Sequence, residues 1–392
     1  MIRLEARVQH STLWRYSSPL LAVLLTLITG YLLFASLGQS PSDALYTFFI
    51  APVADWYGVS ELLVKTIPIL LCAYGLALCF RASVWNIGAE GQLLMGGVAA
   101  STVATMFVHS DSAWAMPLTL LAGIAGGVGW AGLAALMKLR LNTNEILVTI
   151  MMNYIALNIL LWAVHGPLKD PDGFNFPESA LFGDSTLLPV LFADTRLHLG
   201  LVFCAIAMAL SWLFISKSFL GFQTQVLGQD PSAAKMAGFN QTKLVTLVLL
   251  ICGALAGLAG AGEVAGPIGQ LVPQISPGYG YAAIIVAFLG RLHPVGITLA
   301  GLLMGLIYMG GEMAQIELGL PNAITGIFQG LMLFYLLSCD VLIRYRVRWT
   351  QPTTNSAKSA TSAEFKTDAK AEFPHLSQSQ PKGQTSAPAR EQ

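Results

Sequence analysis

Charged side chains are scarce in this sequence. Asp, Glu, Lys and Arg make up 11% of its 392 residues, whereas soluble domains carry roughly 25%. The deficit is uneven, because stretches such as 19–37 and 244–262 hold no charged residue at all. Each is close to the ~20 apolar residues that a helix needs to cross a bilayer. The composition therefore excludes an ordinary water-soluble core and indicates a protein that crosses a membrane several times.

Signatures of catalysis and of metal binding are missing too. The sequence has no GxxxxGK[ST] phosphate loop, no HExxH zinc motif and no GxSxG nucleophile turn. Its six histidines are scattered, and its five cysteines fall in apolar segments without CxxC spacing, as is typical of inert buried thiols. We expect a non-catalytic protein with no cofactor and no metal site.

The formal net charge is zero, with 21 basic and 21 acidic residues. This balance argues against a nucleic-acid partner, because nucleic-acid binding relies on an excess of basic side chains. The first apolar run, 19–37, follows a basic start but is long enough to span and is not closed by a small-residue cleavage site. We therefore expect a retained first helix and no cleaved signal peptide.

The apolar runs predict an all-α fold, a polytopic transmembrane helical bundle of about ten spans (8–10). Glycines interrupt 89–108 and the run 280–290 is short, so either is a candidate for a broken or re-entrant helix. Glycines within 123–127 and 253–262 favour close packing, because small residues let helix backbones approach each other. The expected spans are 19–37, 62–80, 89–108, 115–137, 145–164, 199–216, 243–263, 280–290, 294–311 and 323–340.

Lysine and arginine are distributed unevenly between the two ends of these spans. With the N-terminus inside and an even number of spans, most basic residues fall on the cytoplasmic side, as the positive-inside rule requires. Only Lys65, Lys169 and Arg196 fall on or near the outer side. Both termini are therefore expected in the cytoplasm. The residues placed inside are Arg3, Arg7, Arg15, Arg81, Lys138, Arg140, Lys217, Lys235, Lys243, Arg291, Arg344, Arg346 and Arg348.

Composition divides the chain into three parts. Residues 1–18 form a cytoplasmic N-terminal arm, 19–348 the transmembrane domain and 349–392 a cytoplasmic tail. The tail is rich in Ser, Thr, Ala, Gln, Pro and Lys, a composition that cannot bury enough apolar surface to fold, so we expect it to be disordered. On the outer side, 38–61 and 165–198 are long enough to form small caps.

One cytoplasmic loop, 217–243, is too polar to cross the membrane but predicts a short helix. Asp230 suits the N-cap, Pro231 the first helical position and Gly238 the C-terminal stop. An ordinary connecting loop explains these caps, but not why a helix lies alone between spans. We favour a docking helix that fits a groove in a soluble partner. The expected coupling residues are Gly228, Asp230, Pro231, Ala233, Ala234 and Gly238.

The pattern Gly228-x-Asp230-Pro231-x-Ala233-Ala234-x-x-Ala237-Gly238 resembles the coupling helix of bacterial ABC importer permeases of the sugar, nucleoside and branched-chain amino-acid group. Further motifs resemble the nucleoside-type (purine nucleoside) branch, and the likeness covers roughly residues 60–340. Asp230 departs from the frequent Asn but should cap equally well, and Phe239 replaces the usual aliphatic residue. The further motifs lie at 80–92, 144–156, 166–171, 276–281 and 287–294.

The resemblance implies the permease subunit of an ATP-binding-cassette importer, embedded in the lipid of a bacterial cytoplasmic (inner) membrane. Its implied partners are a separate ABC ATPase, an extracytoplasmic substrate-binding protein and a second permease subunit, identical or different. ATP hydrolysis would belong to the ATPase. Alternatives are a permease for simple sugars or branched-chain amino acids, an ion-coupled secondary transporter, and a structural membrane scaffold. Few acidic residues lie inside the spans and no clear internal repeat is visible, which disfavours the secondary transporter.

Several polar side chains are predicted at membrane depth, where they are costly and usually functional. Such carboxylates and amides suit hydrogen bonds to a base or ribose in transit, whereas the alternative is that they bond to neighbouring helices. For Asn153 and Gln270 both interpretations stay open. For Glu90 we favour transport, although a position nearer the cytoplasmic edge would make it interfacial. The candidate pathway residues are Asn86, Glu90, Gln92, Asn153, Glu263 and Gln270.

Overall fold

The computed structural model describes residues 2–6, 12–321 and 323–349. Contacts divide the chain into two units, Met1–Ser11 with Leu342–Gln392, and Thr12–Val341. In the first unit, β1 (Ile2–Ala6) pairs with β2 (Tyr345–Trp349) in antiparallel register, with Ile2 opposite Trp349. The predicted N-terminal arm thus contains a strand. The predicted disordered tail lies, except for Trp349, outside the described residues.

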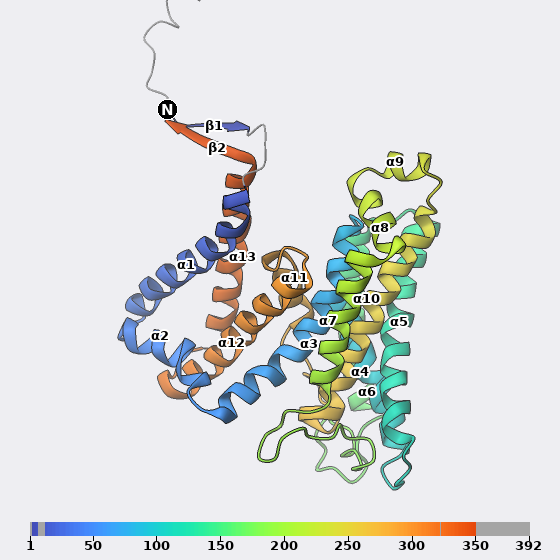
Figure 1. Cartoon of the computed structure of the whole chain (residues 1–392). Coiled ribbons are helices and arrows are strands. Elements are labelled where there is room, and N and C mark those ends of the chain that lie inside the picture. The colour runs from blue at the N-terminus through green and yellow to red at the C-terminus, as the bar shows by residue number, and fades with distance from the viewer. Residues whose placement is uncertain (1, 7–11, 322, 350–392) are drawn as a thin grey trace, which may run out of the picture. The chain divides into compact units, whose positions relative to one another are not determined.

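The second unit is helical, and the all-α prediction is confirmed apart from the two short strands. Several of its long helices run in nearly the same direction between two ends, whereas others lie obliquely to them (Figure 1). We name these ends the α9 end, where the short helix α9 (Pro231–Met236) lies, and the opposite end. The elements are α1 (Thr12–Ser36), α2 (Pro41–Phe49), η1 (Ala51–Val53), α3 (Trp56–Arg81), α4 (Ala89–Met106), α5 (Ala115–Leu141), α6 (Glu145–His165), α7 (Gly200–Lys217), α8 (Phe219–Gln229), α9 (Pro231–Met236), α10 (Gln241–Glu263), η2 (Val264–Ile268), α11 (Tyr279–Leu289), α12 (Pro294–Leu318) and α13 (Ala323–Arg344).

Each predicted span coincides with a helix. Among the described residues, seven helices are long and apolar enough to cross a membrane: α1, α3, α5, α6, α7, α10 (extended by η2) and α12. The glycines do not break α4, which is continuous from Ala89 to Met106. By contrast, the 11 residues of α11 cover only ~16 Å of a ~30 Å hydrocarbon layer. The total number of crossings stays a prediction.

Glycines hold α4, α5 and α10 in very close contact. The close packing predicted at 123–127 and 253–262 is confirmed, and the structure adds α4 to it. A Cβ added at Gly127 would lie 2.1 Å from the carbonyl oxygen of Gly253, and one at Gly257 would lie 2.3 Å from that of Gly123. On α4, a Cβ at Gly96 would lie 2.4 Å from the Cα of Gly257. Backbones this close leave no room for a side chain, so these three helices form one tightly packed core.

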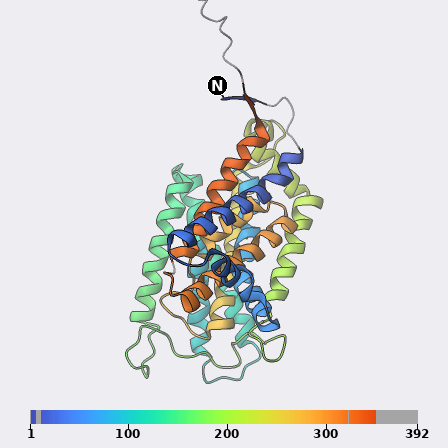
Figure 2. The same cartoon turned by 90° about the vertical axis from the view of Figure 1, so that its left-hand side faces the viewer.

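A second cluster joins α1, α2 and α13, which Figure 2 views from the side where α1 and α13 cross. The ring of Phe328 on α13 lies 4.6 Å from that of Phe48 on α2 and 5.7 Å from that of Phe34 on α1, measured between centroids. All three side chains are buried. The aromatic cluster therefore ties the first two helices of this unit to its last one.

The connection between α6 and α7 lies at the opposite end of the bundle (Figure 1). It runs along the segment after α10, since the backbone N–H groups of Ser179, Phe182 and Leu188 donate to the carbonyls of Leu271, Gly269 and Ala265. His198 is buried in this connection, where its Nδ1 accepts from the N–H of Gly200 at 3.1 Å. Backbone hydrogen bonds therefore hold this connection against the bundle.

Candidate functional site

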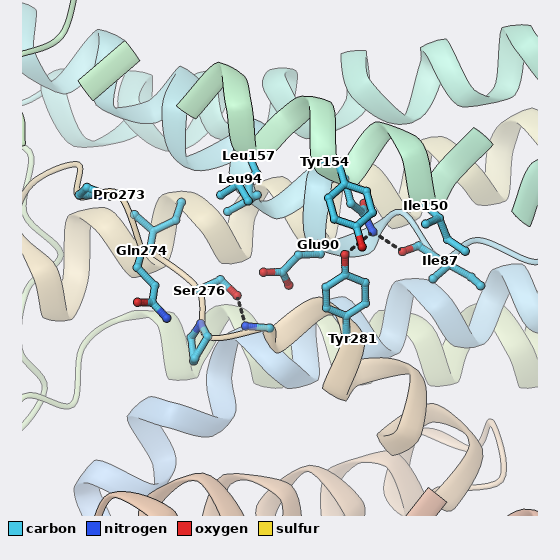
Figure 3. A pocket seen from close by; sticks show the side chains of 14 residues that line it. Ile87, Glu90, Leu94, Ile150, Tyr154, Leu157, Pro273, Gln274, Ser276 and Tyr281 are labelled. Atoms are coloured by element: carbon cyan, nitrogen blue, oxygen red, sulfur yellow. Dashed lines mark hydrogen bonds between the residues drawn. The ribbon is translucent and has the colours of Figure 1, made fainter. Parts of the chain in front are cut away.

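A cavity of about 750 Å³ lies between the start of α4, the middle of α6 and the segment from Pro273 to the first turn of α11. Figure 3 shows its side chains converging from these elements on one space. One part of the wall is apolar, with Ile87, Leu94, Ile150 and Leu157. The polar part of the wall consists of Glu90, Asn153, Tyr154, Gln274, Ser276 and Tyr281.

The cavity lies deep in the predicted membrane layer. Asn153 is eight residues beyond Glu145, where the 21-residue α6 begins, and eight residues rise ~12 Å along a helix of ~32 Å. The cavity also faces away from the packed core, because Tyr154 and Tyr281 are 58% and 41% exposed. Polar groups facing lipid at this depth are unfavourable. This face is therefore suited to a water-filled path or to another subunit.

Glu90 both lines the cavity and fixes the start of α11. Its carboxylate Oε2 accepts from the N–H of Gly280 at 2.7 Å, in the first turn of α11, where a negative charge is favourable. A Cβ at Gly280 would lie 2.3 Å from the backbone nitrogen of Glu90, so only glycine fits. Ser276 completes the turn by accepting from the N–H groups of Gly278 and Tyr279. The carboxylate thus has a structural role next to its place in the wall.

Asn153 joins the same elements from the α6 side. Its side-chain oxygen accepts from the N–H of Gly91 at 2.9 Å, and its Nδ2 donates to the carbonyl of Ile87 at 2.8 Å. The same nitrogen donates to the hydroxyl of Tyr281 at 3.1 Å. Asn153 therefore bonds to neighbouring elements, as one of the two open interpretations expected, and it holds Tyr281 at the cavity wall.

The other candidate pathway residues lie elsewhere. Asn86 and Gln92 are buried and lie 3.5 Å from each other, and Asn86 also contacts the sulfur of Cys252. Gln270 donates to Glu178 in the α6–α7 connection, and Glu263 ends α10 outside this cavity wall. The structure thus brings Glu90 and Asn153 together, and it separates the other four from the cavity.

Four polar wall residues had no predicted role: Tyr154, Gln274, Ser276 and Tyr281. Three of them lie within the motifs at 144–156 and 276–281, so the resemblance already pointed to their segments. What the sequence did not reveal is that these segments meet, since Asn153 and Tyr281 are 128 positions apart.

The predicted docking helix is present as α9, and its caps are confirmed. Asp230 accepts from the N–H of Ser232 at 2.8 Å, Pro231 is the first residue, and Gly238 has a positive φ of 77°. Ala234 is buried and anchors the helix, whereas Met236 is 86% exposed. This short helix presents most of its surface outward.

Aromatic rings extend the exposed apolar surface beside α9. Phe239, the position that departs from the family pattern, packs edge-on against Phe219 and Phe222 of α8, with ring centroids 6.1 and 6.4 Å away. Phe219 and Phe222 are 66% and 55% exposed. We name Phe219, Phe222, Met236 and Phe239 the α9 apolar surface. Exposed apolar patches of this kind mark interaction sites.

The α8–α9 segment is in direct contact with the loop that leads into the cavity. A Cβ at Gly228 would lie 1.9 Å from the carbonyl oxygen of Arg81, and the hydroxyl of Ser83 donates to the carbonyl of Gly228 at 2.8 Å. From Ser83 the chain reaches Ile87 and Glu90 in the cavity wall within a few residues. A displacement of α9 therefore has a short physical route to the cavity.

No group of three or more His, Cys, Asp or Glu side chains within the described part of the chain is arranged to hold a metal ion. The cysteines are buried, as predicted. A helical bundle with a polar cavity at membrane depth and a short helix exposed at one end defines the class: a multi-pass membrane transport subunit.

The particular family follows from comparison. Residues 58–337 match the family described as branched-chain amino acid transport system / permease component, and the chain belongs to this family of ABC importer permeases. The predicted family is confirmed. Members of such a family work with an ATPase and with a binding protein.

The relatives cover most of the chain. The glucose ABC transporter permease TsgB13 of Haloferax volcanii is 34% identical over 85% of this chain and 90% of its own length. The guanosine ABC transporter permease NupP of Bacillus subtilis is 33% identical over 82% of this chain and 92% of its own. The nucleoside ABC transporter permease NupB of Lactococcus lactis is 25% identical over 81% and 89%.

Proposed function

We propose that this chain forms one half of the translocation pathway of an ATP-driven importer for nucleosides. The observation that carries the proposal is the polar cavity at mid-membrane depth on a face that the chain itself leaves uncovered. The other half would be a second permease subunit, identical or different, placed against this face.

The chemistry of the wall suits a nucleoside. The rings of Tyr154 and Tyr281 offer flat apolar faces for a base, and the amides and carboxylate of Gln274, Asn153 and Glu90 suit the hydroxyls of a ribose. The volume of about 750 Å³ lies within the ~300–1,000 Å³ of small-molecule sites. The similarity to guanosine and nucleoside permeases supports the same substrate class.

Glucose is the second candidate, because a glucose permease is a relative at 34% identity. Aromatic rings and amides also bind sugars, so the wall chemistry alone does not separate the two. Two of the three relatives compared are guanosine or nucleoside permeases, however, and the motifs of this chain resemble the nucleoside-type branch. We therefore rank nucleosides first.

The partners follow from the surfaces. A separate ATPase would bind the α9 apolar surface and hydrolyse ATP, so this chain would be non-catalytic. A substrate-binding protein would deliver solute at the opposite end. The distribution of basic residues supports this orientation in the inner membrane, because Arg81, Lys138, Lys235 and Lys243 belong to the α9 end.

Uptake into proteoliposomes that hold the assembled transporter tests the substrate class. Labelled guanosine should accumulate with ATP, and unlabelled adenosine should compete, whereas glucose, ribose and leucine should not. Competition by glucose as strong as that by guanosine would favour the second candidate and overturn the first.

A variant links the uptake to the cavity. Tyr154→Ala should raise the KM for guanosine about tenfold, since stacking on one ring contributes ~1–3 kcal/mol. Tyr31→Ala is the matched control, because Tyr31 on α1 is also exposed, at 47%, but lies outside the cavity wall. An equal effect of both substitutions would show that the cavity is not the binding site.

A further inference from the structure

A second cavity lies at the α9 end, separate from the one described above. It has a volume of about 520 Å³ and lies between α1, the last residue of α3 and the turn that joins α11 to α12. Arg81, Arg291 and His293 line it, and no Asp or Glu is among the described residues of its wall. We propose that this cavity binds the phosphate headgroup of an anionic membrane phospholipid.

The turn between α11 and α12 holds the basic groups in place. Arg291 and Leu292 both have positive φ, 57° and 54°, a conformation that residues other than glycine rarely adopt and that persists only where the surroundings enforce it. Nε of Arg81 donates to the carbonyl of Leu292 at 3.0 Å, and the guanidinium of Arg291 donates to the hydroxyl of Ser18 on α1. Three segments therefore bring two guanidinium groups to one cavity.

These groups match a phosphate. A guanidinium carries five N–H donors in a planar fork, a geometry that fits phosphate oxygens, and charge-assisted bonds of this kind are strong. The wall also includes Val295 and Gly296 in the first turn of the 25-residue α12. The N-terminal turn of a helix adds N–H groups and a favourable dipole for an anion.

The remaining wall favours a lipid over a soluble phosphate. Val295 and Leu299 continue from the basic end along α12 and are 47% and 66% exposed. Leu299 is five residues beyond Pro294, or ~8 Å further along the helix, and so lies towards the hydrocarbon layer. An acyl chain would cover these side chains, whereas a free phosphate would leave them bare. Basic pockets between membrane helices bind anionic headgroups in this way.

Lipid binding to the purified, delipidated full chain in detergent tests the proposal without any transport measurement. Native mass spectrometry would compare phosphatidylglycerol with phosphatidylcholine, and inorganic phosphate would serve as competitor. We expect phosphatidylglycerol to bind about tenfold more tightly than phosphatidylcholine. Inorganic phosphate at the concentration of the lipid should not displace it. Equal binding of the two lipids would overturn the proposal, and displacement by phosphate would assign the cavity to a free anion instead.

Variants assign the binding to this cavity. His293→Glu places a carboxylate at its mouth on an exposed side chain, and Arg81→Gln removes a guanidinium; each should weaken phosphatidylglycerol binding about tenfold. Arg140→Gln is the control, since Arg140 is an exposed arginine in the last turn of α5 and outside the cavity. It should leave binding within about twofold. If Arg81→Gln does not fold, His293→Glu decides, and unchanged binding in that variant contradicts the proposal.

Discussion

At the scale of single residues, the glycines between α5 and α10 impose a strict limit on side-chain size. A Cβ at Gly127 would meet the carbonyl of Gly253 at 2.1 Å, whereas nothing lies within 4 Å of a Cβ at Gly129 on the same helix. Gly127→Ala should therefore destabilise the protein by about 1–3 kcal/mol, the range for overpacked cores. Gly129→Ala should leave stability nearly unchanged. Thermal unfolding of both variants in detergent measures the difference, and equal melting temperatures would contradict the packing described for this core.

His198 gives the protein a second residue-scale property, a dependence of stability on pH. Burial lowers the pKa of this histidine from the ordinary 6.5 to about 4. The folded protein thus holds it neutral while the unfolded chain binds a proton, so stability is full above pH ~6.5 and falls as the pH drops towards ~4. Between pH ~7.5 and ~5 this residue should cost about 2 kcal/mol.

Thermal unfolding of wild type and His198→Gln across that range measures this dependence. The wild type should lose more stability on acidification than the variant. If the two lose the same amount, His198 is not the titrating group.

At the scale of elements, α9 and the α9 apolar surface carry the docking function that we propose. Met236→Glu should abolish co-purification of the partner ATPase, because a charge replaces an apolar side chain that is 86% exposed. Gly238→Val should also weaken assembly, since its φ of 77° is unfavourable for a β-branched residue. Membrane insertion should stay normal in both variants.

Met106→Glu provides the control for these variants. Met106 is also exposed, at 73%, but it is the last residue of α4 and does not belong to the α8–α9 segment. The ATPase should co-purify with it as with wild type. Full ATPase binding by Met236→Glu would remove α9 from the docking site.

The helices also show how much of the fold could be predicted from the sequence. Apolar length predicted the helices that coincide with the expected spans, and the cap residues Asp230 and Pro231 predicted α9. Small-residue spacing predicted close packing at 123–127 and 253–262, although not which helices would meet there. All of these are local signals. Of the polar residues in the cavity wall, only Glu90 and Asn153 were predicted as pathway residues. The cavity depends on contacts between distant segments, such as the hydrogen bond between Glu90 and Gly280, which are 190 positions apart. No local pattern states which segments such a carboxylate will meet.

At the scale of the whole molecule, one contact connects the α9 apolar surface to the cavity. The α8–α9 segment rests on Arg81 and Ser83 through Gly228, and the chain that follows supplies Ile87 and Glu90 to the cavity. A motor that moves α9 would thereby move the cavity wall. In the mechanism that we propose, this chain supplies the translocation path and transmits the movement, and the companion ATPase supplies the energy.

Vesicle transport with and without that companion tests this claim most directly. Proteoliposomes that contain this chain, its permease partner and the ATPase should accumulate labelled guanosine when ATP is supplied on the ATPase side and the substrate-binding protein on the other side. Vesicles that contain the permease chains alone should accumulate none. Net accumulation in vesicles without any nucleotide-hydrolysing subunit would contradict the account.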